Sequence, residues 1–138
     1  MFFHEARLIL AAATIFAAGT LLVGTLCQAA DDVRQVTSEK LPNVPGKSIT
    51  AIVVNYAPGA KSVKHHHACS VLAYVLSGEV RSENSATGPA KVYRAGETFF
   101  EPPGSTHLIS ENASTNEPAS LLAIFVADDG ARLTVSGE

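Results

Sequence analysis

Short apolar runs separated by turn residues make up most of the chain after residue 47. The stretch from Ser48 to Tyr56 is rich in β-branched residues and has no helical stripe, so it predicts a strand. Similar runs predict further strands at Val63–His67, Val71–Leu76, Val80–Glu83, Lys91–Arg94, Thr98–Glu101, His107–Ser110 and Leu121–Ala127. Gly- or Pro-bearing turns separate these runs. Many short strands without a helical period predict an all-β antiparallel sandwich or barrel.

The first 29 residues follow a different pattern. The segment Leu8–Leu26 is almost free of charge, and small residues follow it at Ala29 and Ala30. This pattern predicts a secretory signal peptide over residues 1–29, and hence a periplasmic or secreted protein. The alternative is an uncleaved anchor helix, because the apolar block is long enough to span a bilayer. In that case the leader is the only part expected to meet the membrane.

The remaining chain is expected to form one domain with two polar extensions. Residues 30–47 are polar and are interrupted by Pro42 and Pro45, so we expect an arm with one short strand at Val33–Thr37. The barrel is expected over residues 48–128 and a polar tail over 129–138. A formal net charge of −3 with no basic stripe argues against nucleic acid as a partner. Removing the leader leaves Cys69 as a single thiol, which must then be buried, reactive or a ligand.

Three histidines are the strongest chemical signal. His65 and His67 share one face of an extended strand, whereas His66 points to the other face and is expected at the surface. His107 follows the Pro102-Pro103-Gly104 turn and begins a separate apolar run. Two imidazoles from one strand and a third from a distant strand make a facial set of three nitrogens, which suits a divalent transition metal. The ligand type does not select among iron, nickel, manganese, zinc and copper.

With these stretches placed on strands, the chain resembles the small single-domain cupins. The residues in register with the first cupin motif are Gly59, His65, His67 and Gly78. Those in register with the second are Gly96, Pro102, Gly104 and His107, while Asn112 stands one place late. The resemblance implies a double-stranded β-helix, that is, a jelly-roll barrel with the metal inside. A homodimer formed through exposed strands, with residues 31–47 as the pairing arm, is a further expectation.

One position departs from the cupin pattern. The glutamate that would complete a three-His, one-Glu site falls at Val71, which cannot bind a metal. Cys69 and Ser70 are neighbouring candidates for a fourth ligand, and Cys69 shares the parity of His65 and His67 if the strand continues unbroken. The alternative for Cys69 is a buried structural thiol. Glu101 is another candidate carboxylate, although a solvent-facing charge on a short strand is the favoured interpretation.

Aromatic and aliphatic residues at strand spacing complete the prediction. Most are expected in the core, and those predicted to line a pocket are Tyr74, Leu76, Phe99 and Phe125. One functional hypothesis is an enzyme for a small organic substrate, with an oxygen-dependent oxidation as the reaction. A second is a non-catalytic module that binds a metal or a small ligand. A third is a dimer-forming barrel with a vestigial site.

Overall fold

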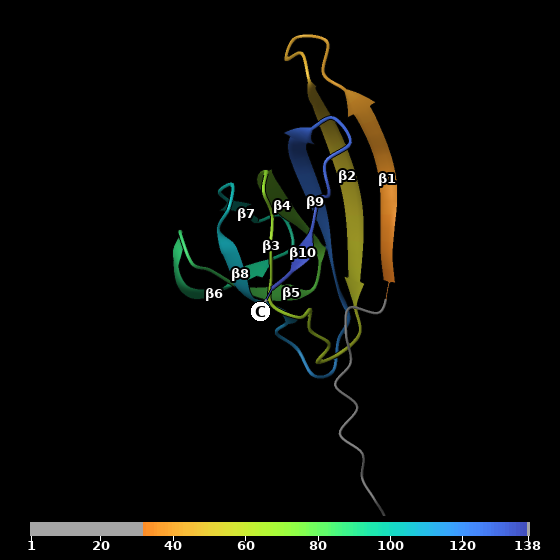
Figure 1. Ribbon diagram of the computed structural model, residues 1–138. Coiled ribbons are helices and arrows are strands. Elements are labelled where there is room, and N and C mark those ends of the chain that lie inside the picture. The colour runs from red at the N-terminus through yellow and green to blue at the C-terminus, as the bar shows by residue number, and fades with distance from the viewer. Residues whose placement is uncertain (1–31, 138) are drawn as a thin grey trace, which may run out of the picture.

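The structure, a computed structural model, describes residues 32–137. The predicted signal peptide lies outside the described residues. Within residues 32–137 there is no helix that is long and apolar enough to cross a membrane. The described chain consists of strands joined by turns (Figure 1): β1 (Asp32–Lys40), β2 (Lys47–Tyr56), β3 (His65–His66), β4 (Ser70–Ser77), β5 (Glu79–Asn84), β6 (Gly88–Arg94), β7 (Thr98–Glu101), β8 (Thr106–Asn112), β9 (Ala119–Asp128) and β10 (Val135–Ser136).

The strands form two five-stranded antiparallel sheets that face each other. One sheet has the order β1-β2-β9-β4-β7 and the other has the order β10-β3-β8-β5-β6. Strands β4 and β9 alternate between buried and less buried residues, as expected where one face of a sheet covers a core. The β1–β2 hairpin extends past the rest of the barrel at the top of Figure 1. The predicted all-β jelly-roll architecture is confirmed.

Strand β4 keeps its small side chains inside and its large ones outside. Val71, Ala73 and Val75 are buried, whereas Leu72, Tyr74 and Leu76 are exposed on the outer face. The prediction that Tyr74 and Leu76 line a pocket is therefore wrong, because strand alternation turns both of them away from the interior. The short inner side chains leave room between the two sheets.

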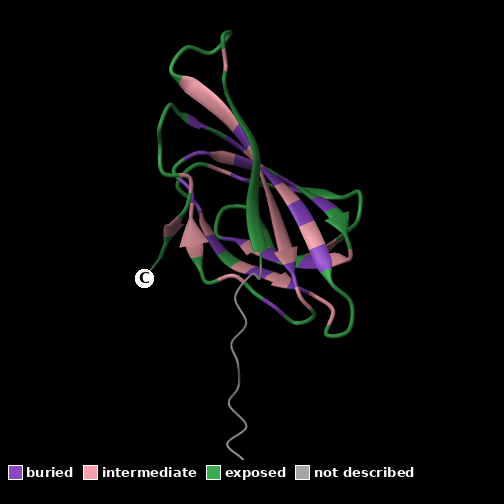
Figure 2. Cartoon of the chain, turned by 90° about the vertical axis from the view of Figure 1, so that its right-hand side faces the viewer, coloured by how far each residue is buried: buried purple, intermediate pink, exposed green. Residues whose placement is uncertain are grey.

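The two ends of the described chain carry more strand than the sequence pattern indicates. Strand β1 pairs along almost its whole length with β2 and is exposed throughout, as Figure 2 shows. Among the described strands, β1 pairs with β2 alone and forms an edge of its sheet, where the predicted homodimer would form. Strand β10 lies in the predicted tail and pairs with β3, so the tail closes the sheet beside His65 and His66.

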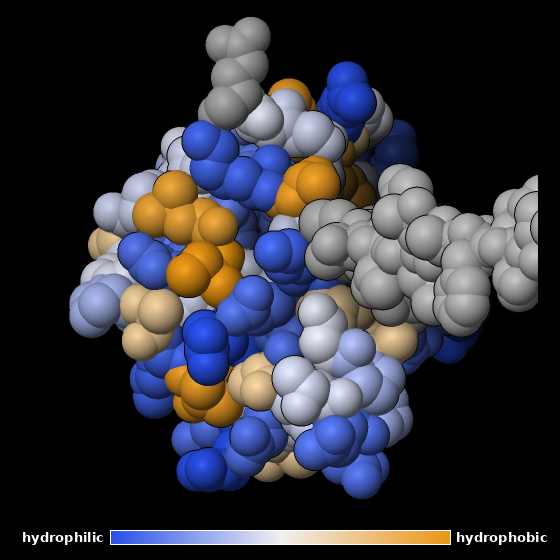
Figure 3. Space-filling view, turned by 90° about the horizontal axis from the view of Figure 1, so that it is seen from below, coloured by the Kyte–Doolittle hydropathy of each residue, from blue (hydrophilic) through white to orange (hydrophobic). Residues whose placement is uncertain are grey.

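Seen from below, the visible surface mixes hydrophobic and hydrophilic side chains (Figure 3).

Asn112 stabilises the loops at one end of the barrel although it stands one place late in the motif. Its buried side-chain amide donates hydrogen bonds to the carbonyl oxygens of Ala57 at 3.1 Å and Glu117 at 2.8 Å. Its Oδ1 accepts a hydrogen bond from the backbone N–H of Ser114 at 2.8 Å. The asparagine therefore has a structural role, because it satisfies backbone groups of two loops at once.

Candidate metal centre

The three histidines of the two motifs meet between the sheets. His65 on β3 lies directly opposite His107 on β8, and His67 follows two residues after His65. The ring centroids are 4.9 Å apart for His65 and His67 and 5.0 Å apart for His65 and His107. One nitrogen from each ring lies within 4.8 Å of the other two. The structure thus brings the three predicted ligands to one point, while His66 is half-buried and does not line the cavity.

Backbone carbonyls hold two of the rings. Nδ1 of His65 lies 2.8 Å from the carbonyl oxygen of Val63, and Nδ1 of His67 lies 2.7 Å from that of Leu133. A carbonyl only accepts hydrogen bonds, so each Nδ1 carries the proton and each Nε2 keeps a free lone pair. This arrangement is typical of metal-ligating histidines, whose second nitrogen is held by an outer partner. Burial lowers the pKa of His65, and the hydrogen bond to the Val63 carbonyl only partly opposes this effect. The lowered pKa favours the neutral imidazole that a metal requires.

His107 lies between a serine and a carboxylate. Its Nε2 is 2.8 Å from the hydroxyl of Ser82 on β5, and its Nδ1 is 3.2 Å from Oε2 of Glu101 on β7. The Ser82 hydroxyl can donate to Nε2 or accept from it. In one tautomer the proton is on Nδ1 and points toward Glu101, while Nε2 accepts from Ser82. In the other tautomer the proton is on Nε2 and is donated to Ser82, and Nδ1 is free to act as a ligand. Ser82 suits both tautomers.

Glu101 is buried, with 3% of its surface exposed, so the favoured interpretation of a solvent-facing charge is wrong. Besides His107, its Oε2 lies 3.9 Å from Nε2 of His67. Burial alone would raise the pKa of Glu101, but the hydrogen bond to His107 and the nearby imidazoles of the three histidines outweigh it and lower the pKa. The carboxylate is therefore a negative charge held beside the three nitrogens.

The position of Glu101 explains how the site keeps a carboxylate without the motif glutamate. Val71 on β4 and Glu101 on β7 are direct partners in the antiparallel ladder. Both residues line the same cavity as the histidines. The carboxylate is therefore supplied by the adjacent strand at the same level of the sheet.

The other two candidates for a fourth ligand do not join the histidines. Cys69 is buried, but its sulfur is not among the donor atoms that meet within 4.8 Å of one another, and it does not line the cavity. Strand β3 ends at His66 and β4 begins at Ser70, so the unbroken strand that the parity argument for Cys69 required is absent. Ser70 precedes inward-facing Val71 on β4 and therefore points to the outer face.

The contacts of Ser82, His107 and Glu101 resemble the nucleophile, base and carboxylate of a hydrolase. Such a serine must reach a substrate. Ser82 is buried and does not line the cavity that contains His107 and Glu101. Its hydroxyl therefore acts as a hydrogen-bonding partner of the imidazole. No sequence signal distinguished Ser82, which is one inward residue of a short polar strand.

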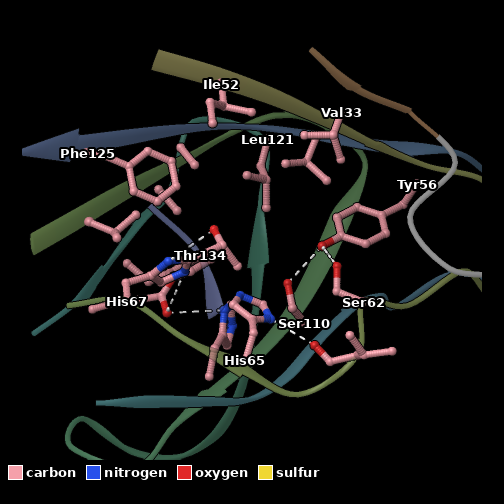
Figure 4. A pocket seen from close by; sticks show the side chains of 18 of the residues that line it. Val33, Ile52, Tyr56, Ser62, His65, His67, Ser110, Leu121, Phe125 and Thr134 are labelled. Carbon is pink, nitrogen blue, oxygen red and sulfur yellow. Dashed lines mark hydrogen bonds and ion pairs between the residues drawn. The ribbon is translucent and has the colours of Figure 1, made fainter. Parts of the chain in front are cut away.

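The histidines open into a cavity of about 280 Å³ between the sheets. Figure 4 shows the imidazoles on one side and the hydroxyl groups of Tyr56, Ser62 and Ser110 on another. Most of the remaining wall is apolar, and Phe99 and Phe125 lie on it as predicted. Among the described residues that line this cavity there is no lysine or arginine. The volume is at the lower end of the range for small-molecule sites.

The donor set fits a divalent transition metal. Three imidazoles and one carboxylate are ligand types for iron, nickel, manganese, zinc and copper alike. His67 and His107 are buried and His65 is half-buried, and a bound cation would accept the lone pairs of nitrogens that meet in this largely apolar cavity. The residues that hold them in place also include the Leu133 carbonyl, which the sequence did not indicate because it belongs to the polar tail.

Known proteins with a similar fold include metal enzymes. A germin-like protein, subfamily 2 member 2, from Arabidopsis thaliana is 32% identical over 91 residues, which cover 63% of this chain and 41% of that protein. Bacillus subtilis oxalate decarboxylase, whose Mn(II) centres have been studied, matches with a TM-score of 0.54 and 30% identity over 64% of this chain and 23% of that one. The chain thus spans less than half the length of these relatives.

A third match shows the fold alone. The DMSP lyase DddQ from Ruegeria pomeroyi DSS-3 superposes with a TM-score of 0.55 and 22% identity, covering 65% of this chain and 45% of that one. The profile of the family described as the cupin domain matches residues 52–125, which is more than half of the chain and includes all three histidines. The chain therefore belongs to the cupin domain family.

Proposed function

We propose that this protein binds one divalent transition metal through His65, His67 and His107 and oxidises a small organic substrate with dioxygen as the oxidant. The observation that supports the metal site best is the set of outer contacts on the three rings. Each ring has one nitrogen beside a carbonyl or hydroxyl oxygen, and one nitrogen of each ring lies within 4.8 Å of the other two. Outer contacts of this kind are typical of metal-ligating histidines.

The residues around the three nitrogens have separate roles in this proposal. When bound, the metal would supply Lewis acidity and open positions for an oxygen-donor substrate. Glu101 offsets part of the positive charge as an ionised carboxylate, with Oε2 3.2 Å from Nδ1 of His107. The apolar walls limit water near the reacting atoms. Mn(II) in the B. subtilis oxalate decarboxylase supports metal binding by this fold, and does not select the metal here.

A non-catalytic module that binds a small ligand is the second candidate. The side of the cavity away from Glu101 offers hydroxyl groups and apolar walls, and no further charged side chain lines it in the described chain. Few groups are therefore available to move protons. Oxygen consumption by the iron- or nickel-loaded protein with catechol, flavonol or diketone substrates separates the candidates. Uptake of oxygen supports the enzyme, and binding without uptake supports the module.

Metal analysis of untagged protein tests the ligand assignment. Substitution of His65, His67 or His107 by Ala is expected to remove most of the bound metal. The matched control is His66→Ala, because His66 lies between two of the ligands and does not line the cavity. Metal content that is unchanged by His107→Ala, or lost equally in His66→Ala, would contradict the proposal.

We also propose that residues 1–29 direct export and are removed. Mass spectrometry of the protein recovered from an extracytoplasmic fraction tests this. A mature chain that begins after Ala29 is expected, and a full-length chain retained in the cytoplasm would contradict export.

A further inference from the structure

A group of three hydroxyls lines the cavity apart from the histidines. The Tyr56 hydroxyl lies 2.8 Å from the hydroxyl of Ser62 and 2.8 Å from that of Ser110. Ser62 is fixed beside Ser110 because its backbone N–H donates to the Ser110 carbonyl at 2.8 Å. Figure 4 shows the three hydroxyls pointing toward one another, on the opposite side of His65 from His67. We call Tyr56, Ser62 and Ser110 the hydroxyl cluster.

In the hydroxyl cluster, at least one O–H group is not used in hydrogen bonds between its three members. Three hydroxyls carry three protons, and the two contacts between them use two protons at most. Within residues 32–137 none of the three hydroxyl oxygens has another hydrogen-bond partner. Burial raises the pKa of Tyr56, so its hydroxyl stays protonated. All three residues line the cavity, and the unused O–H can therefore donate to a molecule inside it.

The charges of the cavity restrict what this donor can bind. Glu101 is the one charged acid among the described lining residues, and no lysine or arginine lines the wall. A second carboxylate placed at the hydroxyl cluster would find no positive charge to offset its desolvation. A neutral acceptor oxygen, such as a carbonyl or a nitro group, needs only the free O–H. The apolar wall between the two polar ends fits a ring or a short hydrocarbon chain.

The strand geometry sets the distance between the two ends. His107 and Ser110 both face the cavity from β8 and are three residues apart, which corresponds to at most about 10 Å along a strand. One molecule of modest size can therefore reach both. The metal end takes an anionic oxygen donor, because a divalent ion with neutral imidazoles and one carboxylate keeps a net positive charge.

We propose that the hydroxyl cluster is a second recognition site, which selects a monoanionic, largely apolar molecule carrying an uncharged acceptor oxygen at the end remote from the metal. This inference rests on the proposed metal site. It excludes small dicarboxylates as good ligands, although the cupin fold is also found in oxalate decarboxylase.

Binding of two catechols to the zinc-loaded protein tests the proposal, since zinc is not redox-active and no turnover occurs. The probes are 4-nitrocatechol, which has an acceptor opposite its metal-binding oxygens, and 4-methylcatechol, which lacks one. The measured quantity is the ratio of their dissociation constants, obtained by titration calorimetry. Any variant that keeps one of the three hydroxyls still has an unused O–H by this count, so the test variant combines Tyr56→Phe, Ser62→Ala and Ser110→Ala. It is expected to reduce the preference for 4-nitrocatechol about five- to tenfold, as for one lost hydrogen bond.

The matched control is Tyr74→Phe, which removes a hydroxyl from an exposed tyrosine on the outer face and should leave the ratio unchanged. If the triple variant fails to fold, the wild-type ratio is compared with the ratio of the two catechols' affinities for zinc ions in buffer, and a wild-type ratio no higher than that overturns the inference. An unchanged ratio in the folded triple variant, or no binding of 4-nitrocatechol to zinc-loaded protein, overturns the inference. A wild-type protein that takes up no zinc contradicts the proposed metal site instead, so the two failures are distinct.

Discussion

Val71 and Glu101 lie directly opposite each other in the ladder between β4 and β7. Val71 stands where the first cupin motif would have a glutamate. Glu101 stands next to Pro102 in the second motif and directs a carboxylate to within 3.2 Å of His107. Because paired residues on one face of a sheet are neighbours, a ligand lost from one strand can be supplied by the other. The pair therefore keeps a carboxylate beside three imidazoles.

Glu101→Gln is expected to lower zinc affinity about tenfold or more, as for loss of a group that orients a ligand and offsets charge. The substitution keeps the size of the side chain and removes its charge. Competition with a chromophoric chelator measures the affinity, and circular dichroism checks the fold.

Two further variants make this test specific to the Val71–Glu101 pair. Glu117→Gln removes an exposed carboxylate and is the matched control, with no expected change. Val71→Glu combined with Glu101→Gln returns a carboxylate to β4 and is expected to recover part of the affinity. If Glu101→Gln and Glu117→Gln bind zinc equally well, Glu101 has no role at the metal.

Ser82→Ala is expected to weaken zinc binding about tenfold, because outer partners of ligating histidines typically contribute that much. Without the hydroxyl, the Nε2 of His107 loses the partner that lies 2.8 Å away. The tautomer with the proton on Nε2 is then less stable, so Nδ1 is less often free to act as a ligand. Ser70→Ala on the outer face is the control. Equal zinc affinities of Ser82→Ala and Ser70→Ala would show that the contact does not tune His107.

Gly78→Ala is expected to destabilise the fold by about 2 kcal/mol more than Gly59→Ala. Both glycines have positive φ, 69° and 71°, so the backbone strain of an alanine is similar at the two sites. A Cβ at Gly78 would clash with the backbone oxygen of Pro118, whereas at Gly59 it meets nothing within 4 Å. Urea unfolding of both variants measures the difference. Equal losses would mean that the loop at Pro118 moves aside at little cost.

The histidine site could be predicted because its signals are local. Two histidines with one residue between them, and a third after a Pro-Pro-Gly turn, retain their relationship whatever the details of the barrel. Burial of Glu101 was not predictable in the same way. Strand β7 has only four residues, with phenylalanine on both of its faces, so its sequence does not show which face of the strand is turned inward. The answer depends on its register with β4, which is fixed by contacts distant in sequence.

Strand β4 shows the same limit more clearly. Its sequence has apolar residues on both faces, so alternation could not separate the inner set from the outer one. Strand spacing suggested that Tyr74 and Leu76 line the pocket, yet the structure places valines and an alanine inside. A barrel that must hold a cavity needs small inner side chains, and this requirement appears only once the site is known.

Alkaline pH is expected to remove the stabilising effect of the Tyr56 hydroxyl. Burial raises the pKa of Tyr56 in the folded state, whereas the unfolded chain releases this proton near the ordinary value of 10.0. Above that pH the folded state binds more protons than the unfolded state, so the free energy of unfolding falls as pH rises. Below it Tyr56 makes no pH-dependent contribution. Tyr56→Phe should be less stable than wild type by about 1 kcal/mol at pH 8, through its lost hydrogen bonds, and the gap should narrow between pH 10 and 11. Urea unfolding of metal-free protein across this range measures it, and a gap that stays constant would show that Tyr56 ionises alike in both states.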